Sequence, residues 1–190
     1  LGPRCGSAVF CALKKGELQF LHIARDCSVG VLNVSRVFVE PSRSMSVERV
    51  AFSRSGSVLS VVHSDDTAIR ECDDDDEHHF CLQFWHFSPR NERYVINTVI
   101  KSAHQSCVTA LSHHPTASMC VTASVDGTFK LWILCNLPPS ASHWEPHKTI
   151  CLRRGPVRDA SFTGDGSLLA IAHEKMLTFW DPSESRTVDT

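Results

Sequence analysis

The sequence has 190 residues and nine cysteines, but no two of the cysteines are spaced Cys-x-x-Cys. Zinc ribbons and thioredoxin-like redox sites need this close pairing to bring two sulfurs to one metal ion or one disulfide, so neither class fits. Five cysteines lie in or beside apolar runs, which favours small buried side chains in a reducing compartment over disulfides. These five are Cys11, Cys81, Cys107, Cys120 and Cys151.

Charge of one sign and long apolar runs are also missing. There are 19 basic and 21 acidic residues, and a net charge of -2 gives no general attraction to nucleic acid. No apolar stretch is long enough to cross a bilayer, so we expect no membrane contact. The chain begins Leu1-Gly2-Pro3 rather than with Met, so we expect an internal segment of a longer protein.

Motifs of enzyme chemistry are absent as well. No Gly-rich phosphate loop, paired-carboxylate motif or Cys–His nucleophile pattern is found. The pair His113-His114, followed by Pro, indicates a turn rather than a metal site. We therefore expect no catalytic residue, no cofactor, no metal ion and no small-molecule substrate.

A repeated pattern of short strands is present instead. Residues 47–57, 108–118 and 157–167 each form an alternating strand followed by a polar turn. Each is followed by an apolar strand and then by a third strand that ends at a Trp. The three tryptophans are Trp85, Trp132 and Trp180, separated by 47 and 48 residues. Alternation at period two excludes helices, and four short strands per unit at this repeat length indicate the blades of a β-propeller.

We therefore predict an all-β propeller fragment of about four four-stranded blades in one partial domain. Residues 1–46 hold the later strands of one blade, with Leu21 in the Trp position. Residues 47–107 form a blade with a long acidic loop insertion, 108–156 a full blade, and 157–190 most of a further blade. Open sheet edges would expose unpaired strands, so we expect the fragment to need the rest of its protein.

Residues 122–132 and 179–181 resemble the WD-repeat signature. In WD repeats a His, a Ser or Thr, an Asp in a tight turn and the Trp form a hydrogen-bonded chain. The resemblance assigns these four places to His104, Ser124, Asp126 and Trp132. Because each member has a structural place, we reject a Ser-His-Asp protease.

The blades of Trp85 and Trp180 depart from this pattern. His63 and His173 stand where the assigned Ser would be, and neither blade has a turn Asp followed by Gly. We therefore expect degenerate hydrogen-bonded chains in these two blades.

The resemblance extends to one family. Residues 84–134 and 161–181 are similar in order and sequence to the WD repeat-containing protein 75 family, and the match covers roughly residues 10–181. It implies a nucleolar, nuclear scaffold of the early small-subunit processome subcomplex, which binds the 5′ end of pre-ribosomal RNA. It further implies support of RNA polymerase I transcription and of small-subunit rRNA processing. The implied partners are other WD-repeat processome proteins and pre-ribosomal RNA complexes.

Two other functions remain open on sequence alone. One is a WD-repeat adaptor or substrate receptor in a ubiquitin-ligase or signalling complex, and the other is a propeller enzyme. An F-box elsewhere in the protein would favour the adaptor, and acidic or His clusters in the central channel would favour the enzyme.

An insertion marks the first full blade. The distance from Val47 to Trp85 is 38 residues, against 24 in the next blade, so about fourteen residues are inserted between Ser64 and His79. The insertion contains the acidic run from Asp73 to Glu77. A metal site or a tag for a basic partner is one interpretation, but like-charge repulsion favours a solvated loop.

Basic residues supply the candidate contacts to RNA or to a partner protein. We place them all on loops, where ordinary exposed charge is the simpler interpretation. Trp144, which falls outside the repeat, is expected to cap a loop. The candidate contacts are Arg153, Arg154, Lys148, Lys14 and Lys15.

Overall fold

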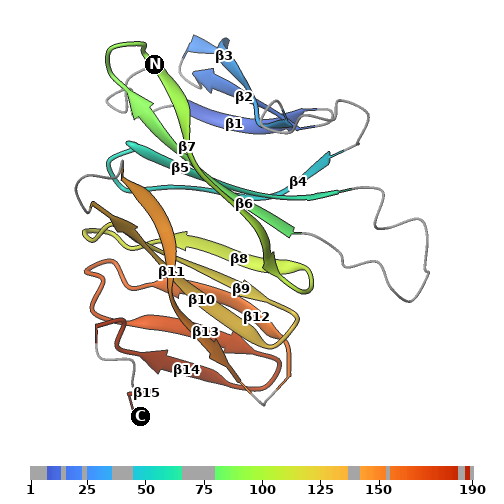
Figure 1. The fold of residues 1–190 in the computed structure, drawn as a ribbon, viewed down its shortest axis with the longest axis vertical. Coiled ribbons are helices and arrows are strands. Elements are labelled where there is room, and N and C mark those ends of the chain that lie inside the picture. The colour runs from blue at the N-terminus through green and yellow to red at the C-terminus, as the bar shows by residue number, and fades with distance from the viewer. Residues whose placement is uncertain are drawn as a thin grey trace.

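The computed structural model describes residues 8–13, 16–22, 25–35, 45–65, 80–136, 142–152, 155–183 and 187–188. Within these ranges the chain forms fifteen strands in four antiparallel sheets. The sheets stack in chain order from the N-terminal to the C-terminal end of the molecule (Figure 1). The predicted all-β propeller fragment is thus confirmed. No helix among these residues is long and apolar enough to span a membrane.

The four sheets are called blades 1 to 4 below. Blade 1 contains β1 (Ala8–Leu13), β2 (Glu17–His22) and β3 (Cys27–Asn33). Blade 2 contains β4 (Met45–Phe52), β5 (Val58–Asp65), β6 (Phe80–Ser88) and β7 (Arg93–His104). Blade 3 contains β8 (Val108–His113), β9 (Met119–Ser124), β10 (Thr128–Cys135) and β11 (His143–Cys151). Blade 4 contains β12 (Val157–Phe162), β13 (Leu169–His173), β14 (Leu177–Trp180) and β15 (Thr187–Val188).

The pairing register repeats from blade to blade. A register shift occurs just before the Trp position, between Leu131 and Trp132 in blade 3 and between Phe84 and Trp85 in blade 2. Blade 1 has the same shift immediately before Leu21. Such bulges increase the local twist of a strand pair, so Leu21 occupies the structural place of the blade tryptophans.

The hydrophobic core lies between the blades rather than inside any one of them. Alternate residues of each strand face opposite neighbours, as the period-two pattern requires. Trp132 packs with Phe84 toward blade 2, whereas Leu131 packs with Leu169 toward blade 4. Trp85 packs toward blade 1. Each such buried side chain contributes roughly 1.5–3 kcal/mol, so a blade's stability depends on both neighbours.

The cysteines divide into two groups. Cys81 and Cys120 are buried, and burial raises the pKa of the Cys81 thiol to about 12, although the charge of Lys101 opposes this. Cys107 and Cys151 are exposed, so the expectation of burial is wrong for these two. Cys107 immediately precedes β8, and Cys151 is the last residue of β11. The side chain of Cys11 lies outside the described residues.

Candidate functional site

Blade 3 holds a buried chain of hydrogen bonds that joins three strands and a turn. The indole Nε1 of Trp132 on β10 donates to Oγ1 of Thr122 on β9 at 2.9 Å. The same Oγ1 lies 2.7 Å from Nε2 of His104 at the end of β7, and Nδ1 of His104 lies 3.3 Å from Oδ2 of Asp126. With His104 protonated on Nδ1, each group donates to the next: Trp132 donates to Thr122, Thr122 to His104, and His104 to Asp126.

The prediction that Ser124 supplies the hydroxyl of this chain is wrong, because Thr122 does. Trp132 pairs with Cys120 across the sheet. Thr122 is two residues from that partner, roughly 7 Å along the strand, whereas Ser124 is four residues away, beyond the reach of the indole. Ser124 instead donates to the carbonyl of Ser106 at 3.0 Å and accepts from the backbone N–H of Asp126 at 3.2 Å. It therefore stabilises the turn.

Asp126 anchors the chain in the turn between β9 and β10. Its Oδ1 accepts from the backbone N–H and the hydroxyl of Thr128, at 2.8 and 2.6 Å. Its Oδ2 accepts from His104 and from the backbone N–H of Gln105. Burial by itself would raise the pKa of Asp126, but the bonds from His104 and Thr128 outweigh it and hold the pKa below its ordinary value. The carboxylate is therefore ionised at neutral pH.

A hydroxyl, an imidazole and a carboxylate in line are also the parts of a hydrolase nucleophile. Here the hydroxyl of Thr122 is fully buried and His104 is 1% exposed. The oxygen of Thr122 is further occupied by the indole of Trp132. No substrate carbonyl can reach it, so this arrangement supports the blade and offers no accessible nucleophile.

In blades 2 and 4 the indole N–H of the tryptophan finds its hydrogen-bond acceptor in a different place. Trp85 donates to Oε1 of Gln83 at 3.0 Å, and Trp180 donates to Oγ1 of Thr178 at 3.1 Å. Gln83 in turn donates to the carbonyl of Val34 in the segment that follows β3, at 3.1 Å. In both blades the acceptor stands two residues before the Trp on the same strand.

The residue at this place explains why blade 3 differs. Lys130 stands two residues before Trp132, and an ammonium group has no acceptor to offer an indole N–H. The acceptor must therefore come from the neighbouring strand. A polar acceptor two residues before the Trp is the sequence feature that could have revealed Gln83 and Thr178 in advance.

Two adjacent histidines connect blade 3 to both of its neighbours. Nε2 of His113 is hydrogen-bonded to Oγ of Ser60 in blade 2 at 2.8 Å. Nε2 of His114 donates to the carbonyl of Gly166 in blade 4 at 2.9 Å, while its Nδ1 accepts from the backbone N–H of Ala117. Burial lowers the pKa of His113 to about 4, although a backbone hydrogen bond at Met119 opposes this, so the ring is neutral at physiological pH.

The prediction that Trp144 caps a loop is wrong, because the residue lies near the start of strand β11. Its ring stacks on Phe84 of blade 2 with 4.2 Å between centroids, and its indole donates to Nε2 of His86 at 3.0 Å. Burial lowers the pKa of His86, which keeps that nitrogen available as an acceptor. The side chain is 3% exposed and belongs to the core between blades 2 and 3.

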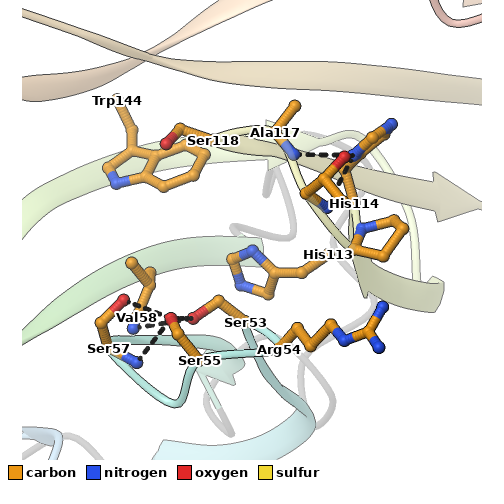
Figure 2. Close-up of a pocket in the computed structure, with 12 residues that line it drawn as sticks. Ser53, Arg54, Ser55, Ser57, Val58, His113, His114, Ala117, Ser118 and Trp144 are labelled. Carbon is orange, nitrogen blue, oxygen red and sulfur yellow. Dashed lines mark hydrogen bonds between the residues drawn. The ribbon is translucent and has the colours of Figure 1, made fainter. Parts of the chain in front are cut away.

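A pocket of about 300 Å³ lies beside these rings, between the β4–β5 turn and the β8–β9 turn. Figure 2 shows the ring of His113 projecting between Trp144 and the turn of Ser53 to Ser57, with Arg54 on the side of that turn. Both turns lie at the opposite ends of the strands from Asp126, because each strand joins one set of turns to the other. The pocket is therefore separate from the buried chain of blade 3.

The comparison with known families covers nearly the whole sequence. Residues 2–189 match the family described as WD repeat-containing protein 75 second beta-propeller. The chain belongs to this family. The resemblance inferred from the sequence is thereby confirmed.

Curated relatives carry the same family name. WD repeat-containing protein 75 of Homo sapiens is 28% identical over 181 residues, which cover 88% of this chain and 21% of the relative. The protein of the same name from Xenopus laevis is 25% identical over 193 residues, covering 95% of this chain and 23% of the relative. The chain thus spans about a fifth of the length of these relatives.

Solved structures share the fold at lower identity. A chain in the "Crystal structure of RRP9 WD40 repeats" has a TM-score of 0.63 and 14% identity, and the match covers 99% of this chain and 48% of that one. A chain in the "Crystal Structure of Mitotic Checkpoint Complex" has a TM-score of 0.62 and 16% identity, covering 96% and 45%. These likenesses show the WD40 propeller fold alone.

The candidate contact residues of this WD repeat-containing protein 75 family member are mostly not placed. Arg153, Arg154, Lys14 and Lys15 lie outside the described residues, as does the acidic run 73–77. Lys148 lies on strand β11, paired with Leu131, so its predicted position on a loop is wrong. Among the described residues, no group of His, Cys, Asp and Glu could hold a metal ion.

Proposed function

We propose that this chain is part of a non-enzymatic scaffold of ribosome biogenesis. The scaffold supports pre-rRNA transcription by RNA polymerase I and the processing of small-subunit rRNA within the small-subunit processome of the nucleolus. The observation that carries the proposal is the match of residues 2–189 to the WD repeat-containing protein 75 family. Since the chain spans about a fifth of its curated relatives, we assign to it the holding of partners rather than the whole activity.

The geometry supports a holding function because the blades are bonded directly to one another. Arg49 of β4 donates to the carbonyl of Thr109 in β8 at 3.0 Å. Thr109 in turn donates to the carbonyl of Val157 in β12 at 2.9 Å. These bonds connect the first strands of three consecutive blades. A rigid frame with exposed turns is the arrangement on which binding surfaces are built.

Contact with pre-ribosomal RNA must be local, because a net charge of -2 gives no overall attraction. We propose that Lys148, on the outer strand of blade 3, contacts RNA phosphate together with Arg153 and Arg154, which follow that strand in the sequence. Lys14 and Lys15 are a second candidate pair. Partner WD-repeat proteins would then supply much of the binding.

Depletion of the full-length protein tests the biogenesis function. We expect small-subunit rRNA precursors to accumulate and polymerase I output to fall, with large-subunit precursors measured separately as the internal control. Normal maturation of small-subunit precursors with unchanged polymerase I output would overturn the proposal. A WD-repeat adaptor of a ubiquitin-ligase or signalling complex would then take its place.

Charge reversal tests the RNA contact. The variant Lys148→Glu/Arg153→Glu/Arg154→Glu of the full-length protein should crosslink less to the 5′ region of the precursor. The matched control reverses three exposed charges elsewhere, Arg25→Glu/Lys101→Glu/Lys175→Glu. Because both variants change the net charge equally, equal crosslinking losses would show a general charge effect and contradict the assigned contact.

A further inference from the structure

The lining of the pocket between blades 2 and 3 carries a positive charge and no negative one. Its twelve lining residues include one charged side chain, that of Arg54, and no carboxylate. Arg54 is exposed, whereas His113 is half-buried, and its lowered pKa leaves it neutral. An accessible guanidinium beside a concavity whose described lining holds no carboxylate matches an anionic group in a partner.

Hydroxyl groups supply most of the remaining polar surface of the pocket. Ser55 lies within hydrogen-bonding distance of Ser53, at 3.3 Å, and of Ser57, at 2.7 Å. Ser53 also accepts from the backbone N–H of Val58 at 3.0 Å, which fixes the turn. Ser118 lines the facing turn. Hydroxyls can donate to an anion, so the wall opposite His113 complements the charge of Arg54.

The same end of blade 2 carries further positive charge. Arg90 and Arg93 are exposed in and beside the β6–β7 turn, and with the exposed Glu92 between them the turn adds one net positive charge. That hairpin is fastened to the β4–β5 turn, because the backbone N–H of Phe87 donates to the carbonyl of Ser57 at 2.8 Å, and Tyr94 donates to the carbonyl of Gly56 at 2.6 Å. Three arginines therefore lie in two turns that are bonded together.

We propose that this pocket, which we call the serine–arginine pocket, is a docking site for a short acidic segment of a partner protein. One Asp or Glu carboxylate enters beside Arg54 and the serine hydroxyls, and neighbouring acidic residues of the segment face Arg90 and Arg93. The proposal rests on the scaffold function above and gives that scaffold one defined partner surface.

The shape and the aromatic rings favour a peptide over RNA. A volume of about 300 Å³ is at the lower end of ligand-pocket sizes and suits one or two side chains. Recognition of unpaired bases uses exposed aromatic rings, but Trp144 is 3% exposed and already stacked on Phe84. The rings of His113 and His114 are half-buried and are already hydrogen-bonded to Ser60 and Gly166. Each described ring that lines this pocket is therefore already engaged within the protein.

Fluorescence anisotropy with the full-length protein tests the proposal. The probe is a labelled Asp-Gly-Asp-Gly-Asp peptide, and its uncharged match is Asn-Gly-Asn-Gly-Asn. We expect the Asp peptide to bind the wild-type protein. Arg54→Glu removes one charge-assisted hydrogen bond and should weaken the affinity for this peptide by about tenfold or more. Arg25→Glu makes the same charge change on an exposed turn of blade 1 and should leave binding unchanged.

A second variant tests the pocket without altering charge. Ser118→Trp places a large side chain in the cavity and should also weaken the binding of the Asp peptide. Failure of the Asp peptide to bind, equal binding of the Asn peptide, or equal binding by the Arg54→Glu variant would each overturn the proposal. Binding of oligouridine with the same dependence on Arg54 would overturn it in favour of a nucleic-acid contact.

The peptide assay is independent of the cellular tests of function. Loss of peptide binding in a protein that still associates with pre-ribosomal RNA overturns the pocket assignment alone. Retained, Arg54-dependent peptide binding in a protein whose depletion leaves small-subunit precursors normal overturns the ribosome-biogenesis proposal alone. The two failures are therefore distinguishable.

Discussion

His113 and His114 are neighbours in the chain, yet their rings are hydrogen-bonded to two different blades, one on each side of blade 3. His113 is hydrogen-bonded to Ser60 in blade 2, and His114 donates to Gly166 in blade 4. Successive residues at a strand end point in opposite directions, which is why two adjacent side chains can reach two different neighbours. The position of blade 3 is thus fixed from both sides by one dipeptide.

The contact between His114 and Gly166 predicts a large effect of Gly166→Ala. An added Cβ would lie 2.3 Å from Cε1 of His114, and the φ of +80° at this residue is strained for any residue with a side chain. The strain alone should destabilise the blade by about 1–2 kcal/mol. Thermal unfolding of the full-length variant, with hydrogen exchange in β8 and β12, measures the effect.

The matched control lies two residues away in the same turn. Gly164→Ala adds a Cβ that meets no heavy atom within 4 Å, so its effect should stay within about 0.5 kcal/mol. Similar losses of stability in Gly164→Ala and Gly166→Ala would show that the contact with His114 is not the cause.

A second prediction distinguishes the roles of the Thr122 and Ser124 hydroxyls. Thr122→Val leaves the indole of Trp132 and Nε2 of His104 without their shared partner, which should cost about 1–3 kcal/mol. Thr122→Ser retains the hydroxyl and should cost less. The exchange rate of the Trp132 indole proton is the direct measurement. An indole released by Ser124→Ala but not by Thr122→Val would return the hydroxyl role to Ser124.

Asp126 should make the stability of blade 3 depend on pH. Its pKa in the folded chain lies below the ordinary value of 3.8, so its stabilisation is fully present above that pH and is lost as the pH falls toward the folded pKa. Asp126→Ala should cost on the order of 1–3 kcal/mol at neutral pH, and the difference from wild type should shrink in acid.

The control for Asp126 is Asp181→Ala. Asp181 accepts from the backbone N–H of Ser183 at 2.8 Å just after β14, in a part-exposed turn, so we expect a smaller loss at neutral pH. Hydrogen exchange of β9 and β10 as a function of pH measures the effect of Asp126. A pH-independent difference between wild type and Asp126→Ala would contradict the ionised anchor.

A fourth prediction concerns the acceptors of the other tryptophans. Gln83→Leu removes the acceptor of Trp85 and the donor to Val34, both in a buried site, so it should cost about 1–3 kcal/mol. Lys130→Leu changes the equivalent position of blade 3 and should cost little, because Trp132 uses Thr122. Denaturant unfolding followed by Trp fluorescence compares them. If Lys130→Leu were the more damaging, the acceptors would be wrongly assigned.

The fold could be predicted because it depends on spacing. Strands of alternating apolar residues and tryptophans 47 and 48 residues apart specify the four-strand repeat without knowledge of any contact. The hairpin turned at Gly16 predicts that Leu21 takes a Trp position, and Leu21 carries the same register shift as Trp85 and Trp132.

The site was less predictable because it depends on register and on contacts between blades. Thr122 and Ser124 are alike in chemistry and face the same side of β9, and only the pairing of Trp132 with Cys120 separates them. The fourth strand of a blade carries no residue signature of the repeat, so the sequence predicts a full blade over 108–156 without placing Trp144 and Lys148 on its outer strand, β11. Bonds such as that of His113 to Ser60 join residues 53 positions apart, beyond any local pattern.

The indole N–H of the blade tryptophan has a different kind of acceptor in blade 2 and in blade 3. The two blades should therefore differ in how well they tolerate a longer connection between their second and third strands. In blade 3 that connection carries Asp126, so lengthening it would dismantle bonds on which the indole of Trp132 indirectly depends. In blade 2 the acceptor of Trp85 travels on the same strand as the indole itself. The bond of Trp85 therefore does not run through the equivalent connection, which is the one that contains the acidic insertion. We therefore expect the indole bond of Trp85 to tolerate a change in the length of that connection, and the bonded chain of Trp132 to be disrupted by one.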